Sequence, residues 1–278
     1  MLGHQLLTQL APRHEVRVTL RKRLDAYAQF GLFHPDNAHA EVELSTMDRL
    51  RPVIAAFTPE AVINAAGIVK QRPTAEETIP SLEINALLPH RLAVVCREVG
   101  ARLIHISTDC VFSGRKGGYR EADIADAEDL YGRTKYLGEV REGNCITLRT
   151  SIIGLELSRK TGLLEWFLAQ RGAIRGYRNA IFSGFTTIEL ARIIEMLLTG
   201  FPRASGLYHV SSAPISKFDL LRLVKQRLAL SVEIMPYDDF RCDRSLDSSR
   251  FQGEFGYRAP DWPAMVDELA SQIQGAPR

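Results

Sequence analysis

Apolar positions along the first 150 residues follow two periods in turn, which predicts strands that alternate with helices. Short β-rich apolar runs predict the strands, and longer stretches with apolar residues at helical spacing predict the helices. Such alternation implies right-handed βαβ crossovers, so we expect an α/β fold with a doubly wound parallel sheet. The predicted strands are Val16–Leu20, Glu41–Leu44, Ala61–Asn64, Arg102–Ile106 and Cys145–Leu148, and the predicted helices are Met47–Phe57, Ser81–Val99 and Leu130–Arg141.

The second half of the chain has a less regular pattern and predicts a smaller lobe that closes over a substrate. We expect one domain over residues 1–153, with 184–212 returning to it, and a substrate-binding lobe made of 154–183 and 213–278. The predicted helices here are Gly162–Arg171, Thr186–Thr199, Lys217–Ala229 and Pro263–Ile273, and the predicted strands are Leu207–Val210 and Val232–Met235.

The start of the chain lacks a feature that this pattern leads one to expect. Gly3 is followed at once by a helical pattern (Leu6, Leu7, Leu10), and no first strand or complete glycine motif precedes it. We interpret Gly3 as the last glycine of a phosphate-binding strand–turn–helix unit whose earlier part is missing. The alternative is a chain that never carried the motif.

Composition narrows the class of protein. The 278 residues are 45% hydrophobic and 24% charged, with a formal net charge of +2, so the chain is an ordinary globular protein for which charge predicts neither nucleic-acid nor membrane binding. The four cysteines stand far apart without a CxxC pair, so we expect neither a zinc site nor a disulfide framework. A cluster of potential metal ligands is formed by His34, Asp36 and His39, but it lacks a further supporting ligand. We interpret it as a polar loop and expect no metal. We expect a cytoplasmic protein.

The strongest local chemistry lies in Tyr131-Gly132-Arg133-Thr134-Lys135, with Ser107-Thr108-Asp109 at the end of a predicted strand. Tyr131 and Lys135 are four residues apart and share one face of a helix. A lysine ammonium near a phenol stabilises the phenolate, which makes the tyrosine a usable proton donor and acceptor. A YxxxK pair alone also occurs by chance on exposed helices.

The surrounding motifs make the pair more specific. These motifs are Ile106–Gly114 (ISTDCVFSG), Tyr119, Glu121 and Asp129–Glu139 (DLYGRTKYLGE). In them the chain resembles the extended short-chain dehydrogenase/reductase family, and within it most nearly the dTDP-4-dehydrorhamnose reductase group. Four further segments agree with the same family pattern: Asn64–Gly67 (NAAG), Asn85, Leu148–Ser151 (LRTS) and Gly206–Val210 (GLYHV). The resemblance implies a Rossmann-type fold and an NADPH-dependent reductase of a nucleotide-linked 4-keto-6-deoxy sugar.

The resemblance also implies roles for individual residues. Tyr131 would protonate the oxygen of a keto group as hydride arrives from the nicotinamide, Lys135 would hold the ribose hydroxyls, and Thr108 would hydrogen-bond the carbonyl. The expected cofactor-binding residues are Gly3, Arg21, Lys22, Asn64, Ala65, Ala66, Gly67, Asn85, Ser107, Tyr131 and Lys135; the expected substrate-binding residues are Asp109, Cys110, Ser151 and Arg244.

The choice of cofactor follows from the turn after the first predicted strand. Arg21, Lys22 and Arg23 stand where an enzyme that prefers NAD would place an acidic residue for the ribose hydroxyls. Three cations suit a 2′-phosphate instead, so we expect NADP(H) to be preferred over NAD(H). The alternative is a solvated basic turn.

Two further departures from the family pattern concern the sugar and the oligomer. Ile152 stands where the rhamnose reductases carry a tryptophan that contacts the sugar, and Gln5 stands where some of them have a metal-binding glutamate at a subunit interface. These residues leave the identity of the deoxysugar and a homodimer open.

Cys110 bears on the type of reaction. Sugar-nucleotide dehydratases of the superfamily carry a glutamate at this position, so cysteine argues against dehydration. GDP-fucose synthases have a cysteine here and use it to epimerise the ketosugar before reduction, which would require a thiol of lowered pKa and an opposing acid. His209 and His105 are the candidates for that acid, although His105 lies within a predicted strand, which favours a core position. The alternative is a small apolar residue that packs the site.

A third reading comes from another class of protein. Members of the same family resemble a regulatory subunit of methionine adenosyltransferase, and the missing glycine motif would fit a subunit that binds NADP without turnover. Two further groups of residues are weaker candidates. One could line the base of a nucleotide or belong to the core, and it consists of Trp166 and Phe167. The other could bind a pyrophosphate or form a solvated face, and it consists of Arg241, Asp243 and Arg244.

Overall fold

The structure is a computed structural model that describes residues 1–69, 76–158 and 160–275, and the chain divides into two compact units. Unit 1 is Met1–Ser107, Asp129–Thr147 and Ala191–Leu207, and unit 2 is Thr108–Glu128, Leu148–Leu190 and Tyr208–Arg278. These units assign 108–128, 148–153, 184–190 and 208–212 differently from the domains expected from the sequence. The function of the expected substrate lobe stays a prediction.

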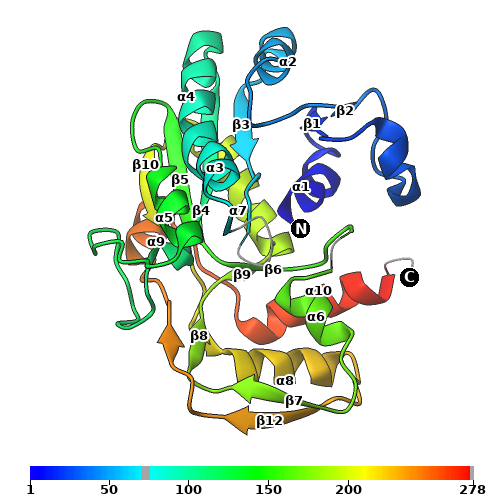
Figure 1. Cartoon of the computed structure of the whole chain (residues 1–278), viewed down its shortest axis with the longest axis vertical. Helices are drawn as coiled ribbons and strands as arrows, with labels where there is room; N and C mark the ends of the chain where they lie inside the picture. The colour runs from blue at the N-terminus through cyan, green and yellow to red at the C-terminus, as the bar shows by residue number, and fades with distance from the viewer. Residues whose placement is uncertain (70–75, 159, 276–278) are drawn as a thin grey trace. The chain divides into compact units, whose positions relative to one another are not determined.

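A four-stranded sheet, in the order β10-β5-β4-β3, forms the centre of unit 1 (Figure 1). Its strands are β3 (Ala61–Asn64), β4 (Arg102–Thr108), β5 (Cys145–Thr150) and β10 (Gly206–His209), and the last residues of β4, β5 and β10 belong to unit 2. β3 and β4 are parallel, with Asn64 opposite His105. This arrangement confirms the expected α/β fold with a parallel sheet.

A separate two-stranded sheet pairs β1 (Val18–Thr19) with β2 (Ala38–His39) in parallel. The strand predicted at Glu41–Leu44 is wrong, because the partner of β1 lies earlier in the chain. Glu41 has a φ of 58°, and this left-handed backbone conformation ends the extended segment.

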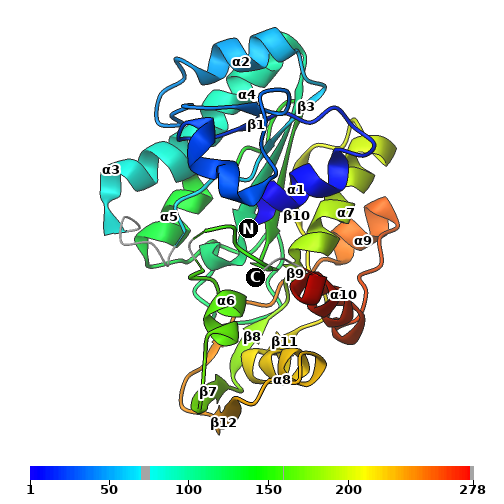
Figure 2. The same ribbon diagram turned by 90° about the vertical axis from the view of Figure 1, so that its right-hand side faces the viewer.

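Helices cover both faces of the central sheet of unit 1, with α4 and α5 on one face and α7 on the other (Figure 2). The helix predicted at Ser81–Val99 is built in three parts, of which the middle one is π-helical. The helices of unit 1 are α1 (Leu2–Leu10), η1 (Leu24–Phe30), α2 (Leu50–Phe57), α3 (Thr78–Ser81), the π-helix η3 (Leu82–Leu87), α4 (Leu88–Val99), α5 (Leu130–Leu137) and α7 (Thr187–Gly200, from Ala191 onward).

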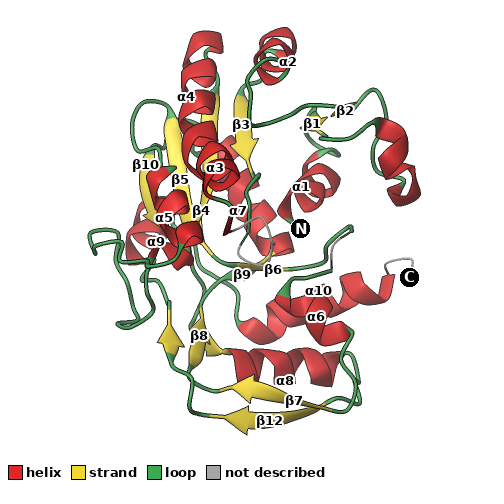
Figure 3. Ribbon diagram, viewed as in Figure 1, coloured by secondary structure: helices red, strands yellow, loops and turns green. Residues whose placement is uncertain are grey.

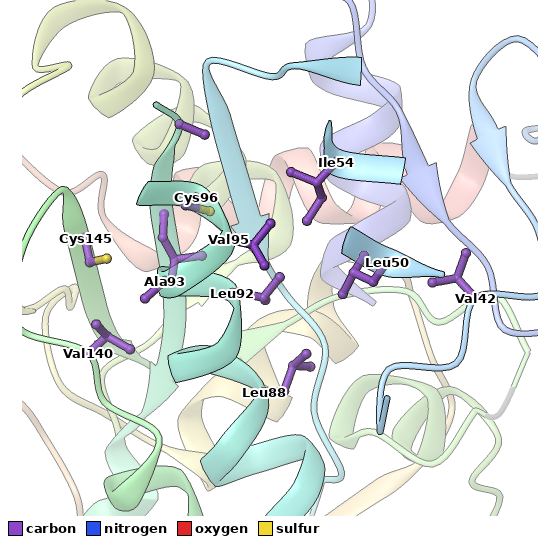
Figure 4. Packing of buried hydrophobic residues seen from close by; sticks show 12 residues of the cluster. Val42, Leu50, Ile54, Leu88, Leu92, Ala93, Val95, Cys96, Val140 and Cys145 are labelled. Carbon is purple, nitrogen blue, oxygen red and sulfur yellow. The ribbon is translucent and has the colours of Figure 1, made fainter. Parts of the chain in front are cut away.

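The core of unit 1 explains how the sheet is held. Leu88, Leu92, Val95 and Cys96 recur at helical spacing on α4 and pack with Leu103 of β4 and with α2 (Figure 4). Burying each large aliphatic side chain contributes about 1.5–3 kcal/mol. The cluster therefore fixes β4, whose carboxyl end carries Ser107.

Unit 2 is built from short strands, four α-helices, the short helix η4 (Asp109–Val111) and the first turn of α7 among its described residues (Figure 3). Parallel pairs form between β6 (Ile152–Ile153) and β9 (Phe185–Thr186), and between β7 (Ala173–Tyr177) and β12 (Glu233–Tyr237). A three-stranded sheet has the order β11 (Ile215–Ser216), β8 (Ala180–Phe182), β13 (Cys242–Asp243). The helices are α6 (Leu163–Leu168), α8 (Lys217–Arg227), α9 (Ser249–Phe255) and α10 (Trp262–Gly275), with α8 packed on β7, β12 and α10. None of the described helices has both the length and the apolar character needed to cross a membrane.

Candidate active site

The loop after β3 is held by a buried asparagine. Asn64 Nδ2 lies 3.1 Å from His105 Nδ1, and Asn64 Oδ1 accepts the Ala66 N–H at 3.2 Å. Because an amide nitrogen only donates, His105 Nδ1 accepts, and the ring proton of a neutral His105 sits on Nε2. Burial, with the Lys135 charge as a smaller cause, lowers the pKa of His105 well below its ordinary value. His105 is therefore a neutral core residue that supports the Asn64–Gly67 loop, which agrees with its place within a strand and weakens its alternative role as an acid for Cys110.

Asn85 ties the next residue of this loop to α5. Its Oδ1 accepts the Ile68 N–H at 2.9 Å, and its Nδ2 donates to Ile68 O at 3.0 Å and to Thr134 Oγ1 at 3.3 Å. Both amide N–H groups are thus used within the protein. We therefore expect Asn85 to affect a cofactor by shaping the Gly67–Ile68 backbone.

Helix α5 carries the tyrosine–lysine pair. Asp129 caps the helix, since its Oδ1 accepts the Gly132 N–H at 2.9 Å. Tyr131 lies half-buried in the first turn, and Lys135 is buried one turn later with its Nζ donating to Ile106 O at 2.7 Å. Burial lowers the pKa of Lys135 to about 8, although Glu139 opposes the shift. A lysine so placed changes protonation near neutral pH, as proton-handling sites require.

Ser107, the next residue of β4, contacts the same segment. Its Oγ donates to Glu139 Oε1 at 3.0 Å. The structure therefore links Lys135 and Glu139 to consecutive residues of β4, Ile106 and Ser107. Glu139 was quoted in the sequence motif but not predicted as a site residue, although its position four residues after Lys135 was the available signal.

The remaining predicted cofactor residues are exposed or only partly buried. Gly3 lies exposed in the first turn of α1, and Arg21 and Lys22 are exposed in the turn that follows β1. Arg23 in the same turn lies 3.6 Å from Asp25. Ala65 is exposed, and Ala66 and Gly67 are half-buried. The arrangement leaves Arg21 and Lys22 available to an anion.

In unit 2, Thr108 begins a short helix, η4 (Asp109–Val111). Its Oγ1 accepts the Cys110 N–H and donates to Asp109 Oδ1, both at 3.1 Å. Burial raises the pKa of Asp109, and Arg244 with the Thr108 hydrogen bond partly offsets this. Electrostatic interactions therefore couple four of the predicted site residues: Thr108, Asp109, Cys110 and Arg244.

Cys110 does not have the electrostatics of a nucleophile or base. Burial, followed by the neighbouring Asp109, raises the pKa of the Cys110 thiol to about 12. A reactive cysteine needs the opposite shift. The structure therefore favours a packing role for Cys110.

His209 belongs to a buried polar network and not to an acid–base pair. Arg149 Nη1 lies 3.1 Å from His209 Nε2, and His209 Nδ1 lies 2.9 Å from Tyr119 O. Arginine only donates and a carbonyl only accepts, so Nε2 accepts and Nδ1 carries the proton. His209 is thus neutral with both nitrogens engaged, which contradicts the hypothesis that it opposes Cys110. Arg149, which also lies 5.0 Å from the Phe112 ring, was not predicted.

The other predicted site residues of unit 2 contact the backbone, lie in the core or are exposed. Arg244 Nε donates to Phe112 O at 2.8 Å, and Ser151 O accepts the Phe185 N–H at 2.9 Å. Phe167 is fully buried core, whereas Trp166 and Arg241 are exposed. Within the described ranges, no group of three or more His, Cys, Asp or Glu side chains is arranged to hold a metal ion.

Comparison with known proteins agrees with this geometry. The model of the RmlD substrate binding domain family matches residues 1–274. A dTDP-4-dehydrorhamnose reductase of Aggregatibacter actinomycetemcomitans is 26% identical in an alignment 260 positions long that covers 84% of this chain and 88% of that protein. A methionine adenosyltransferase 2 subunit beta of Bos taurus is 30% identical in an alignment 167 positions long that covers 53% of this chain and 49% of that protein. The crystal structure of dTDP-4-dehydrorhamnose reductase from Bacillus anthracis in complex with NADP superimposes with a TM-score of 0.76 at 20% identity, over 93% of this chain and all of that one, which confirms the Rossmann fold.

Proposed function

The chain belongs to the RmlD substrate binding domain family, as the sequence motifs predicted, and we propose on this basis that it is an NADPH-dependent reductase of a nucleotide-linked 4-keto-6-deoxy sugar. The observation that carries the proposal is the buried Lys135, one helical turn after Tyr131, with its Nζ 2.7 Å from Ile106 O. The names of the reductase relatives support dTDP as the nucleotide.

The residues of unit 1 fit a nicotinamide cofactor. Asn64 and Asn85 fix the backbone of the loop that carries Gly67, and a residue without a side chain lets a ligand approach that backbone closely. Asn64, Ala65, Ala66 and Gly67 would line the cofactor, Ser107 and Lys135 would contact its nicotinamide end, and Gly3 would lie at its phosphates. When bound, the cofactor supplies the hydride.

The chain's own residues supply the proton and the orientation. Tyr131 donates its phenolic proton to the carbonyl oxygen of the substrate, and the Lys135 ammonium stabilises the phenolate that remains. Thr108 would hydrogen-bond the substrate carbonyl through its hydroxyl, as the family resemblance implies. Asp109, Cys110, Ser151 and Arg244 would contact the sugar nucleotide.

The preference for NADPH rests on the turn after β1. Arg21 and Lys22 are exposed, and a guanidinium can bind a phosphate through two hydrogen bonds. An exposed basic turn would therefore distinguish a 2′-phosphate from a ribose hydroxyl.

The test is the Tyr131→Phe variant, with Tyr136→Phe as the matched control because Tyr136 is exposed on the same helix. We expect Tyr131→Phe to lose turnover by about 10²-fold or more while its fluorescence titration with NADPH stays near wild type, and Tyr136→Phe to behave as wild type. NADPH should bind more tightly than NADH. A fully active Tyr131→Phe enzyme would refute the proposed proton donor.

A second candidate, an NADP-binding regulatory subunit without turnover, is favoured by the relative named methionine adenosyltransferase 2 subunit beta. The turnover assay separates the two, because both would bind NADPH: a wild-type chain that binds NADPH but reduces no 4-keto sugar nucleotide would support the regulatory subunit. The epimerase-reductase alternative is weakened by the raised pKa of Cys110 and by the engaged nitrogens of His209.

A further inference from the structure

The tyrosine–lysine pair is the first part of a longer series, Tyr131, Lys135 and Glu139, in which each residue stands four after the last. Helix α5 ends at Leu137, but Gly138 keeps helical backbone angles and the Glu139 N–H donates to Tyr136 O at 3.2 Å. Glu139 therefore follows Lys135 by one turn, on the same side of the segment.

The Glu139 side chain is 1% exposed and is held at both oxygens. Oε1 accepts from Ser107 Oγ at 3.0 Å, and Oε2 lies 3.0 Å from Arg141 Nη2. A buried carboxylate is costly unless it is paired and hydrogen-bonded, so these contacts favour a single fixed position.

Lys135 and Glu139 hydrogen-bond adjacent residues of strand β4, because Lys135 Nζ donates to Ile106 O and Glu139 Oε1 accepts from Ser107 Oγ. Among the described residues, His105 and His90 are the other titratable groups of this neighbourhood. His105 of β4 is neutral, and His90 of α4 is occupied by Leu137 O at 2.8 Å. Arg141 lies on the far oxygen of Glu139, with its side chain 46% exposed.

We propose that Glu139 is a positioning residue of the reductase site, whose buried carboxylate balances the charge of the Lys135 ammonium and anchors Ser107 at the end of β4. The proposal rests on the proposed function, since it assigns Glu139 a task only if Lys135 acts in the reaction.

The consequence is a link between Glu139 and the pH range in which Lys135 is charged. Burial disfavours the ammonium, and a nearby carboxylate favours it. The two effects act on Lys135 in these directions, with burial the larger. Without the carboxylate, Lys135 loses its proton at lower pH and no longer supports the Tyr131 phenolate.

The experiment follows the titration of Lys135 by NMR in the full chain labelled with ¹³C at lysine Cε. The sequence has seven lysines, and the resonance missing from Lys135→Met identifies the one of interest. In Glu139→Gln we expect the Lys135 midpoint to move to lower pH, and the alkaline limb of the kcat profile to move with it. Glu142→Gln, which changes an exposed carboxylate three residues later, should leave both at the wild-type position.

A second variant keeps the proposal testable if Glu139→Gln fails to fold. Arg141→Gln removes a half-exposed cation from Glu139 and leaves its negative charge to Lys135, so the Lys135 midpoint should move to higher pH. An unchanged Lys135 midpoint in a folded Glu139→Gln variant, or an unchanged or lower midpoint in Arg141→Gln, would overturn the proposal.

The NMR titration needs neither cofactor nor substrate. A wild-type chain without reductase activity would therefore refute the proposed function, while the coupling between Glu139 and Lys135 would still be decided by its own measurement.

Discussion

Gly138 is the position at which one added methyl group should do the most damage to the candidate site. A Cβ at Gly138 would lie 2.0 Å from the backbone oxygen of Asn85, 3.0 Å from its carbonyl carbon and 3.2 Å from Pro89 Cγ. Gly138 has a φ of −84°, which any residue adopts, so glycine is needed here for space alone. The carbonyl oxygen cannot rotate out of the way, because Asn85 lies inside the π-helical segment η3.

The size of the effect follows from that distance. Ordinary contact begins near 3.4 Å, so the end of α5 and η3 must separate by about 1.4 Å, the difference between 3.4 Å and 2.0 Å. Such overpacking costs about 1–3 kcal/mol, and each kcal/mol lowers the melting temperature of a chain this long by about 2–4 °C. A displacement of about 1 Å in a catalytic group can cost about 10²-fold in rate, so turnover should fall more than stability.

The assay compares Gly138→Ala with Gly200→Ala in thermal unfolding followed by circular dichroism and in NADPH-dependent turnover. Gly200 ends helix α7, and a Cβ there meets nothing within 4 Å, so its replacement should be neutral or slightly stabilising. A Gly138→Ala variant with wild-type melting temperature and kcat would refute the argument that α5 and η3 are fixed by this contact.

Two further predictions concern titratable groups. Burial lowers the pKa of Lys135 from its ordinary 10.5 to about 8, so between these values the unfolded chain binds a proton that the folded chain does not, and stability contributed by Lys135 rises with pH. Urea unfolding at pH 8 and pH 10.5 should therefore show wild type gaining on the order of 3 kcal/mol relative to Lys135→Met, and a constant difference between the two would contradict the burial argument. Because the Cys110 thiol has a pKa of about 12, Cys110→Ser should keep reductase turnover within about threefold, and wild type should not exchange the proton beside the keto group in D₂O. Exchange in wild type that Cys110→Ser abolishes, followed by NMR of the sugar, would restore the epimerase reading.

The sequence predicts the parallel sheet and the placement of the chemistry at its strand ends. Asn64 and Ser107 follow apolar runs that can only be buried strands, and Tyr131 and Lys135 lie one helical turn apart, so their residue types and spacing suffice. The strand expected at Glu41–Leu44 fails because apolar alternation does not reveal a left-handed residue such as Glu41. The π-helical segment Leu82–Leu87 is missed because an apolar pattern does not separate it from an ordinary helix.

Roles that depend on hydrogen-bond partners lie beyond what spacing reveals. Nothing local to Asn85 indicates that its amide is used by Ile68 and Thr134. The tautomer of His209 follows from the guanidinium of Arg149 and the carbonyl oxygen of Tyr119, sixty and ninety residues earlier in the chain. The sequence names residues by type, whereas the assignment of positioning and packing roles requires the partners that the fold provides.

The most direct test of the central claim is the transfer of hydride itself. The wild-type chain is incubated with NADPH carrying deuterium at the transferable position of the nicotinamide and with a dTDP-linked 4-keto-6-deoxy sugar, and the sugar product is analysed by mass spectrometry and NMR. We predict one deuterium at carbon 4 of the product, and no labelled product from Tyr131→Phe. Bound NADPH and sugar nucleotide without transfer of deuterium in wild type would contradict the account.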